Sequence, residues 1–488
     1  MTIHALATPW APGARLYSLP GSMILKLALG EATAMVPARL DVRERVYPPA
    51  TGLDGGPIDR LLAQHAGAAH VTRMFGSAAG LGKAGQRHLG FDDIEHVTGV
   101  ARTFRIDMAP TAPVAHLIDD LRQLSTVEAA SHNYACTVPL AATGAALETP
   151  LGAALDEDTA WASRDQVFAA EALAYEPGDS AVVIGIIDSG VAPDHPELAG
   201  RFRNGFDTVH LRADGLAAGM RLLGDKPATD HRPIDNYVGH GMGCAGIIGA
   251  LGEHIPPGIA GNCQILPIRV LGAAQVPGRA APIGIGSIAD IDAGMKMAVD
   301  LGAKVLNMSF GTADSALDPE APKPHSDVVR YACLRGCVLV AASGNSGLHE
   351  VYWPAAFDGV IATGSVGLTG RPSPFTTTGD HVALCAPGEQ VATASLDGYQ
   401  LATGTSFAAP FAAAAAALLV SRAEDRSFPI DGAVIRQILS ASTSPFSIQA
   451  SGCGSGILNA FAALQQLDQH IDAAPAVGAD VHESNLVA

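Results

Sequence analysis

The sequence predicts an α/β protein built on an open parallel sheet flanked by helices, preceded by a smaller α+β domain. From residue 181 to residue 440, short apolar runs bounded by turn residues alternate with segments of helical periodicity, as a parallel sheet requires. Residues 1 to 138 follow another order, strand, helix, strand, strand, helix, strand, which indicates a sandwich with an antiparallel sheet. A chain of 488 residues can hold both domains.

Each element of the first domain is expected from its apolar pattern. The expected strands are Met23 to Leu29, His70 to Phe75, Thr103 to Met108 and Val127 to Tyr134. The expected helices are Ile58 to Ala66 and a segment from Val114 to Leu124, whose apolar residues recur at helical spacing. Residues 139 to 158 are rich in Ala, Gly, Thr and Pro without periodicity, so we predict a linker there.

The larger domain is expected over residues 159 to 466, beginning with a helix from Trp161 to Glu176. Its expected strands are Ala181 to Ile187, Gln264 to Val270, Lys304 to Met308, Cys337 to Ala342 and Val360 to Ser365. Its other expected helices are Gly241 to Leu251, Ser287 to Leu301, Ser326 to Leu334, Ser406 to Ser421 and Gly432 to Ser440. Residues 467 to 488 are acidic and Ala-rich, and we predict a disordered tail.

The composition and charge of the chain limit the partners that it can bind and the compartment in which it is expected. A formal charge of -18 and a pI near 5.3 argue against nucleic acid or an anionic membrane as main partners, since both need basic patches. The first ten residues lack the basic and apolar regions of a signal peptide. The apolar run Phe411 to Val420 is far shorter than the roughly 20 residues of a membrane span. We therefore expect a cytoplasmic protein.

Seven cysteines are scattered along the chain, and their number is odd. Without an export signal they are expected to be reduced, buried thiols. Cys333 and Cys337 stand four residues apart, but Gly336 lies between them and no histidine pair is near, so a metal site is not expected there.

One stretch places a serine where a nucleophile is expected. In Gly404-Thr405-Ser406-Phe407 the serine stands between a glycine turn and an apolar helix, beside backbone N–H groups that can stabilise an oxyanion. A serine hydroxyl also needs a base to take its proton and an acid to orient that base. His240, in Gly239-His240-Gly241, is the candidate base, and Asp188, which ends an apolar strand, is the candidate acid.

These three segments resemble the motifs of the subtilisin-like serine peptidases, the subtilase family, in the family's order Asp, His, Ser. An α/β-hydrolase runs Ser, Asp or Glu, His, and a sedolisin would carry glutamate in place of His240. The resemblance implies a subtilisin-like fold for the larger domain. It also implies that Ser406 is the nucleophile, His240 the general base and then acid, and Asp188 the residue that fixes the histidine tautomer.

The resemblance extends to residues beside the triad. The segment Ala341 to Gly347 resembles the one whose asparagine side chain completes the family's oxyanion hole, so Asn345 is the expected second donor. The segment Asn307 to Gly311 resembles the strand edge that pairs with the substrate backbone. The residues expected to wall the pocket for the residue before the cut are Ser309, Phe310, Gly311, Ala342, Ser343 and Gly344.

The first domain resembles the family's inhibitory propeptide, a ferredoxin-like unit, in the order of its elements. Val127 to Tyr134 resembles the strand before the propeptide tail that enters the active site. This implies an intramolecular inhibitor, with any cut inside the linker 139 to 158. The alternative is an unrelated small α+β domain.

The sequence departs from the family's pattern near His240 and at a loop. Met242 and Gly243 stand where Thr and His are usual, and residues 201 to 237 are longer than compact members need, so we expect a surface insertion there. Leu251 to Gly258, where many members form a calcium loop, offers few oxygen ligands, so no metal cofactor is expected at that loop. Calcium elsewhere would have to use acids of the insertion: Asp207, Asp214, Asp225 and Asp230. Cys244, one helical turn after His240, is expected to pack in the core.

We therefore expect a serine endopeptidase that hydrolyses protein or peptide substrates through an acyl-enzyme and is made as a self-inhibited precursor. Two alternatives stay open. A peptide transamidase or macrocyclase would use the same triad but release the acyl group to an amine, and product mass would distinguish it. A pseudopeptidase would only bind peptides, although the four intact positions Asp188, His240, Asn345 and Ser406 argue against it.

Overall fold

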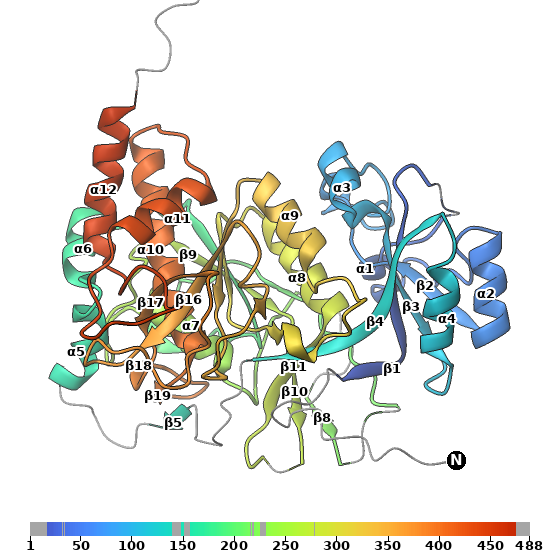
Figure 1. Ribbon diagram of the computed structural model, residues 1–488, viewed down its shortest axis with the longest axis horizontal. Helices are drawn as coiled ribbons and strands as arrows, with labels where there is room; N and C mark the ends of the chain where they lie inside the picture. Colours follow the sequence, from blue (N-terminus) through green and yellow to red (C-terminus); the bar gives the residue numbers. More distant parts are fainter. Residues whose placement is uncertain are drawn as a thin grey trace, which may run out of the picture.

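The computed structural model describes residues 17 to 474, except 32, 34, 139–147, 151–156, 215, 217–218, 225–230 and 278. Its centre is an open sheet in the order β17-β16-β14-β12-β6-β9-β7, with every adjacent pair parallel (Figure 1). This confirms the predicted parallel sheet. Its strands are β6 (Val183–Asp188), β7 (Phe206–Asp207), β9 (Gln264–Arg269), β12 (Val305–Met308), β14 (Val338–Ala342), β16 (Val360–Val366) and β17 (Val382–Pro387).

Helices cover both faces of this sheet because alternate side chains of each strand point to opposite faces. In β14, Val340 packs with the cluster of α7 and α10, whereas Leu339 packs with the cluster of α8 and α9. The first face carries α7 (His240–Gly249), α10 (Thr405–Asp425), α11 (Gly432–Ala441) and α12 (Ala460–Ala473). The second face carries α8 (Ile288–Asp300) and α9 (Ser326–Leu334).

Helix α10 lies at the core of the first face. Its alanines, from Ala412 to Ala417, are almost fully buried and contribute little bulk, so the helix can lie close to the strands. Among the described residues it is the one helix long and apolar enough to cross a membrane. However, 94% of its apolar window is buried inside the protein, which accounts for that composition. It also extends beyond both expected ends, Ser406 and Ser421.

The first domain has the predicted order of strands and helices. Its four strands pair antiparallel in the order β2-β3-β1-β4, which is the ferredoxin-like arrangement, and α2 and α4 share an apolar core with them. The short helices α1 and α3 were not expected. The elements are β1 (Ser18–Leu27), α1 (Arg39–Arg43), α2 (Pro57–Ala66), β2 (Ala69–Arg73), α3 (Asp93–Thr98), β3 (Thr103–Met108), α4 (Val114–Leu121) and β4 (Val127–Thr137).

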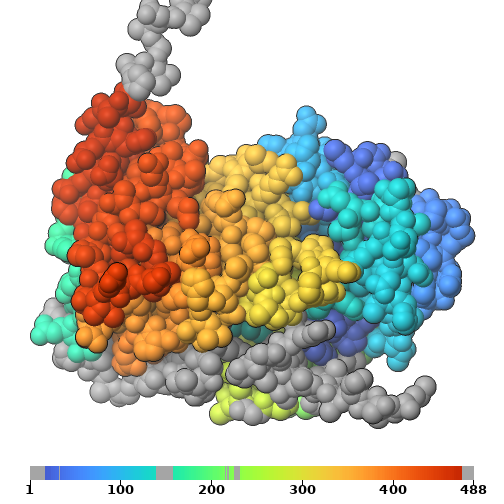
Figure 2. Space-filling view, in the orientation of Figure 1, coloured from blue at the N-terminus to red at the C-terminus, as the bar shows by residue number. Residues whose placement is uncertain are grey.

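Strand β4 connects the two domains. It continues three residues beyond the expected end, and Ala135 to Thr137 pair with β11 (Ile283–Ser287) of the larger domain. Strands β10 (Gly272–Gln275) and β8 (Arg221–Leu223) extend the same sheet. Part of the insertion 201 to 237 thus adds a strand to a sheet, and Figure 2 shows the first domain, in blue and cyan, lying against the yellow segments of the larger one.

The remaining hairpins lie at the edges of the larger domain. Strand β5 (Glu148–Pro150) pairs with β19 (Tyr399–Ala402), which pairs with β18 (Val391–Ala394). Strands β13 (Thr312–Ala313) and β15 (Tyr352–Trp353) form a separate pair.

Two predictions were wrong in detail. The single helix expected from Trp161 to Glu176 is two helices, α5 (Glu157–Asp165) and α6 (Ala169–Tyr175), because Phe168 has a left-handed backbone with φ of 57°. The tail expected from residue 467 is helical as far as Ala473, because Leu464 and Leu467 of α12 are buried against α6 and α10. Residues 475 to 488 lie outside the described residues.

Candidate active site

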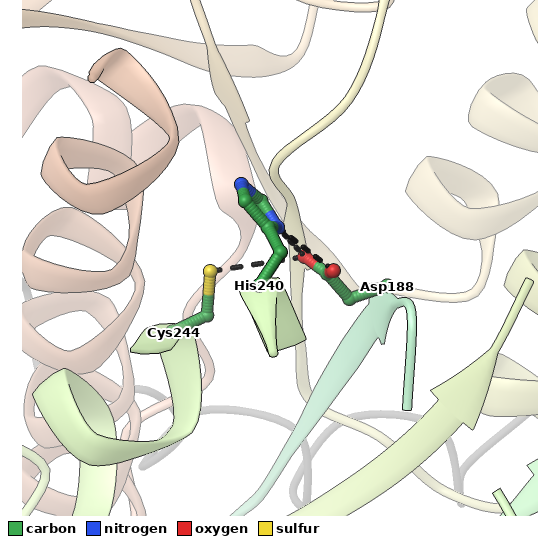
Figure 3. Close-up of side chains that lie close together, drawn as sticks. All are labelled: Asp188, His240 and Cys244. Atoms are coloured by element: carbon green, nitrogen blue, oxygen red, sulfur yellow. Dashed lines mark hydrogen bonds and ion pairs between the residues drawn. The ribbon is translucent and has the colours of Figure 1, made fainter. Parts of the chain in front are cut away.

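The structure brings Asp188 and His240 into direct contact. Asp188 ends β6 and His240 begins α7, so both lie at the carboxyl edge of the parallel sheet, where such sheets bind their ligands. His240 Nδ1 lies 2.8 Å from Asp188 Oδ1 and 3.0 Å from Oδ2, and both side chains are buried. Figure 3 shows the second ring nitrogen of His240 directed away from the carboxylate. This is the geometry in which an acid orients a catalytic base.

A second carboxylate holds the backbone that leads to His240. Asp235 is buried and accepts hydrogen bonds from the backbone N–H groups of residues 237 to 239 at 2.8 to 2.9 Å. It also accepts one from the Ser189 hydroxyl, whose oxygen in turn accepts from the N–H of Gly241. These bonds fix the start of α7 next to Asp188. Neither Asp235 nor Ser189 was among the predicted site residues, because the bonds that join them to the start of α7 cross long stretches of the chain.

Ser406 lies in the first turn of α10, in contact with the substrate-edge segment and with the neighbourhood of His240. Its hydroxyl donates to the Ser309 carbonyl oxygen at 3.4 Å, and its own carbonyl oxygen accepts from the Ser309 hydroxyl at 2.8 Å. The thiol of Cys244 also donates to that carbonyl oxygen, at 3.5 Å. The His240 ring packs on the ring of Phe407, with centroids 5.1 Å apart.

Asn345 is held with its amide nitrogen toward the serine motif. Its Oδ1 accepts from the Thr405 N–H at 2.9 Å and from the Thr405 hydroxyl at 2.8 Å. Gly404, before that threonine, has φ of 147°, and a Cβ added there would lie 3.2 Å from Asn345 Nδ2. A glycine is therefore required at 404, both for its backbone and for the approach of the amide.

The expected pocket wall is only partly made of side chains. The ring of Phe310 is fully buried and packs edge-on against His325 at 5.4 Å. The side chain of Ala342 lies in the core cluster of α7 and α10, and the Ser343 hydroxyl donates to the Thr377 carbonyl oxygen. Phe310, Ala342 and Ser343 can therefore offer a substrate mainly backbone groups.

The edge at Gly311 is already paired with a segment of the chain. The N–H of Gly311 donates to the Thr137 carbonyl oxygen at 3.3 Å, so the end of β4 lies between β11 and Gly311. The chain is described again at β5, which pairs with β19, the strand that leads into Gly404 and Ser406. The described parts of the chain on either side of residues 139 to 147 thus lie on two strands next to the serine motif.

Cys244 contacts the catalytic pair as well as the serine backbone. Its Sγ lies 3.7 Å from Asp188 Oδ2, and Asp188, His240 and Cys244 offer metal-ligand atoms within 4.8 Å of one another (Figure 3). Within this group of three residues, the Asp188 carboxylate and His240 Nδ1 are already hydrogen-bonded to each other, as a catalytic acid and base require. The thiol is fully buried, in agreement with the expected packing role.

The loop expected to lack calcium is held by a carboxylate. Glu197 is fully buried and accepts hydrogen bonds from the backbone N–H groups of residues 252 to 255. In the insertion, Asp207 pairs with Arg269 and Asp214 pairs with Arg212. Asp225 and Asp230 lie outside the described residues.

Comparison with known proteins agrees with this geometry. The model of the subtilase family matches residues 179 to 461, which is more than half of the chain. The chain belongs to the subtilase family. The predicted family, the subtilisin-like fold and the enzyme class, a subtilisin-like serine protease, are thereby confirmed.

Individual relatives agree with this assignment. Thermitase from Thermoactinomyces vulgaris is 32% identical over 59% of this chain and 89% of its own length. A thermophilic serine proteinase from Bacillus sp. strain AK1 is 33% identical over 50% of this chain, and the match spans about half of the relative, 53%. A solved protease from Pseudoalteromonas arctica superposes with a TM-score of 0.53 at 24% identity, over 64% of this chain and 97% of its own, and supports the fold.

Proposed function

We propose that this subtilase is a serine endopeptidase that hydrolyses peptide bonds through an acyl-enzyme on Ser406. The observation that carries the proposal is the buried Asp188–His240 pair, whose histidine ring packs on Phe407, the residue after Ser406 in the first turn of α10. In the acylation step His240 takes the Ser406 proton while the oxygen attacks the scissile carbonyl, and it then passes that proton to the leaving amine. In the second step His240 activates water, which releases the acid product and regenerates the serine.

The negative charge that develops on the oxygen of the scissile carbonyl group needs hydrogen-bond donors to stabilise it. The start of α10 supplies backbone N–H groups, and Asn345 supplies its amide, oriented by Thr405. Removing one such donor lowers kcat by about 10²- to 10³-fold, a magnitude measured in a member of this family. Asn345→Ala is therefore expected to lower kcat by this factor with little change in KM.

The same proposal includes a self-inhibited precursor. An extended peptide binds an exposed strand edge through main-chain hydrogen bonds, whatever its sequence. The end of β4 makes such bonds with β11 and with Gly311, so residues 1 to 138 place part of their own chain where a substrate would lie. The cut that relieves the inhibition is proposed within residues 139 to 158.

A reducing compartment, such as the cytoplasm, fits the cysteines. None of the seven forms a disulfide, and six of them are buried. Disulfides form and persist in oxidising compartments and are rare in reducing ones.

The test is intact mass over time for the native chain and for Ser406→Ala, each with a fluorophosphonate probe. We expect the native chain to be labelled on Ser406 and to shorten within residues 139 to 158, and the variant to do neither. Labelling without shortening would leave the peptidase and make the first domain a retained regulator. The proposal fails if the native chain is not labelled even after limited removal of residues 1 to 150.

A further inference from the structure

A small pocket beneath the substrate edge holds the side chain of Cys136. The residue is 2% exposed, and its Sγ lies 3.4 Å from the Gly311 carbonyl oxygen and 3.5 Å from the Thr312 hydroxyl. The ring of Tyr352 closes another side, since a Cβ added at Gly311 would lie 2.4 Å from that ring. The Cys136 thiol is therefore enclosed by Gly311 and Thr312, with the ring of Tyr352 packed on Gly311.

A histidine lies beside this thiol. His325 stands just before α9, fully buried, with its Nδ1 2.5 Å from Asp292 Oδ1 on α8. Its Nε2 forms no hydrogen bond of normal geometry with the described residues. Burial alone would lower the pKa of this ring, but the Asp292 carboxylate outweighs it, the Cys136 thiol adds to it, and the pKa is raised to about 9. At neutral pH both ring nitrogens therefore carry a proton, and Nε2 is a donor that needs an acceptor.

We propose that His325 makes this peptidase select substrates with a small hydrogen-bond acceptor, a thiol or a hydroxyl, at the residue that takes the place of Cys136. The inference rests on the proposed function, because it concerns peptides that replace the end of β4 in the same register. In that register alternate side chains point into the protein. The residue before the one bonded to Gly311 is Cys136, whose thiol interacts with His325.

The chemistry of the pocket ranks the candidate side chains. A serine or cysteine can accept from Nε2–H of His325 and donate to the Gly311 carbonyl oxygen. Valine or alanine leaves the buried donor without a partner, which is costly. A carboxylate would bring a second negative charge next to Asp292 in a buried site.

The experiment uses the full chain and three internally quenched peptides with the sequence of residues 131 to 150. They differ only at the place of Cys136, which carries Cys, Ser or Val. The chain's own β4 segment competes equally with all three, so it cancels in the ratio of their kcat/KM values. We expect the Cys and Ser peptides to be cut at similar rates and the Val peptide about tenfold more slowly, the effect of one unpaired buried donor.

Variants then assign the preference to His325. His325→Phe keeps a ring but removes the donor, so the Cys-to-Val ratio should fall to about one. His325→Gln restores an N–H donor and should restore part of the ratio. His381→Phe, at a half-buried histidine whose neighbours lie outside the groove, is the matched control and should leave the ratio unchanged.

The outcomes separate this inference from the proposed function. A Val peptide cut as fast as the Cys peptide by the native chain overturns the inference, and so does a ratio that His325→Phe leaves intact. Labelling of Ser406 without cleavage of any peptide also overturns it, because the peptides then do not occupy the groove as β4 does. If Ser406 is not labelled at all, the proposed function fails first. The native peptide series needs no variant to fold.

Discussion

The contacts around α10 and the contacts between the two domains differ in the kind of group that they bury. Around α10 the contacts are apolar, with alanines from Ala412 to Ala417 packed against strands and helices of the larger domain. Between the domains, by contrast, whole ion pairs are buried. Arg105 is 1% exposed and its Nη1 lies 3.1 Å from Asp290 Oδ1 on α8, which also pairs with Arg39.

A second buried cluster repeats this pattern. Lys296 of α8 lies 2.7 Å from Glu95 of the first domain and 2.7 Å from Asp300, and all three are almost fully buried. The stability that apolar packing contributes changes little with pH or salt. A buried charge, by contrast, destabilises the fold once its partner is lost. The contrast indicates that the larger domain has a permanent core and that the first domain is held by a contact sensitive to conditions.

The largest expected effect on stability comes from breaking the interdomain contact at Asp290. In the Ser406→Ala background, Asp290→Ala leaves Arg39 buried without its counter-charge and takes from Arg105 one of its two carboxylate partners, the other being Asp107. The loss should lower the free energy of unfolding by about 3–5 kcal/mol. Urea unfolding measures it. Replacing Arg39 and Asp290 together by Met and Leu should recover most of the loss, because Arg105 then keeps Asp107 as its partner and no charge is left uncompensated. A loss below about 1 kcal/mol for Asp290→Ala would contradict the account.

The next effect is a pH dependence at His325. Its folded pKa, about 9, lies above the usual 6.5, so the protonated ring favours the folded state. This stability is complete below pH 6.5 and is lost as pH rises through 9, with a total of about 3 kcal/mol. The free energy of unfolding of Ser406→Ala against pH should show this fall, and His325→Phe should flatten it. An unchanged pH curve in that variant would assign the fall to other groups.

A smaller effect tests the apolar region. Ala414→Val adds two methyl groups to a fully buried position of α10 and should cost about 1–3 kcal/mol. This cost should be the same at pH 6 and pH 9, unlike the stability that the protonated His325 ring contributes. Ala433→Val, at an exposed position of α11, is the control and should cost less. A cost at Ala414 that varies with pH would weaken the contrast between the regions.

The smallest effect concerns ion pairs at the surface. Arg426 pairs with Asp468 at 3.1 Å and with Asp472 at 2.7 Å, where water screens the charges. Arg426→Ala should change the free energy of unfolding by less than about 1 kcal/mol, in contrast to Asp290→Ala. Thermal unfolding at low and high salt would show whether burial, rather than charge alone, decides the size of the effect.

The sequence predicted elements well where local signals agree. The helix Ser326–Leu334 and the strand Thr103–Met108 have the expected bounds, because apolar spacing and turn residues mark both ends. Helix α12 was missed as a whole although Asn459 caps its start, because the polar and alanine-rich stretch after Leu467 offers few apolar residues. Strand β17 was also missed. It is short and ends in Pro387, a residue that is uncommon in strands.

At the site, the motifs predicted that Asp188 and His240 would meet, and they do. They could not predict the clamp made by Ser189, nor that β4 would continue as far as Thr137, because both depend on groups far apart in the chain. The pairing of Arg105 with Asp290 spans 185 positions and has no local signal. Long-range charge pairing is therefore what the sequence did not reveal.

Strand β4 joins the strands of the first domain to those of the larger domain, and this bears on how copies of the chain behave together. Without β4, the strand β11, with Ile283 and Ile285, is an unprotected edge. An open edge accepts a matching strand from any chain, and the strand that matches it best is the β4 of another copy. Concentrated precursor is therefore expected to exchange this strand between copies and form domain-swapped dimers.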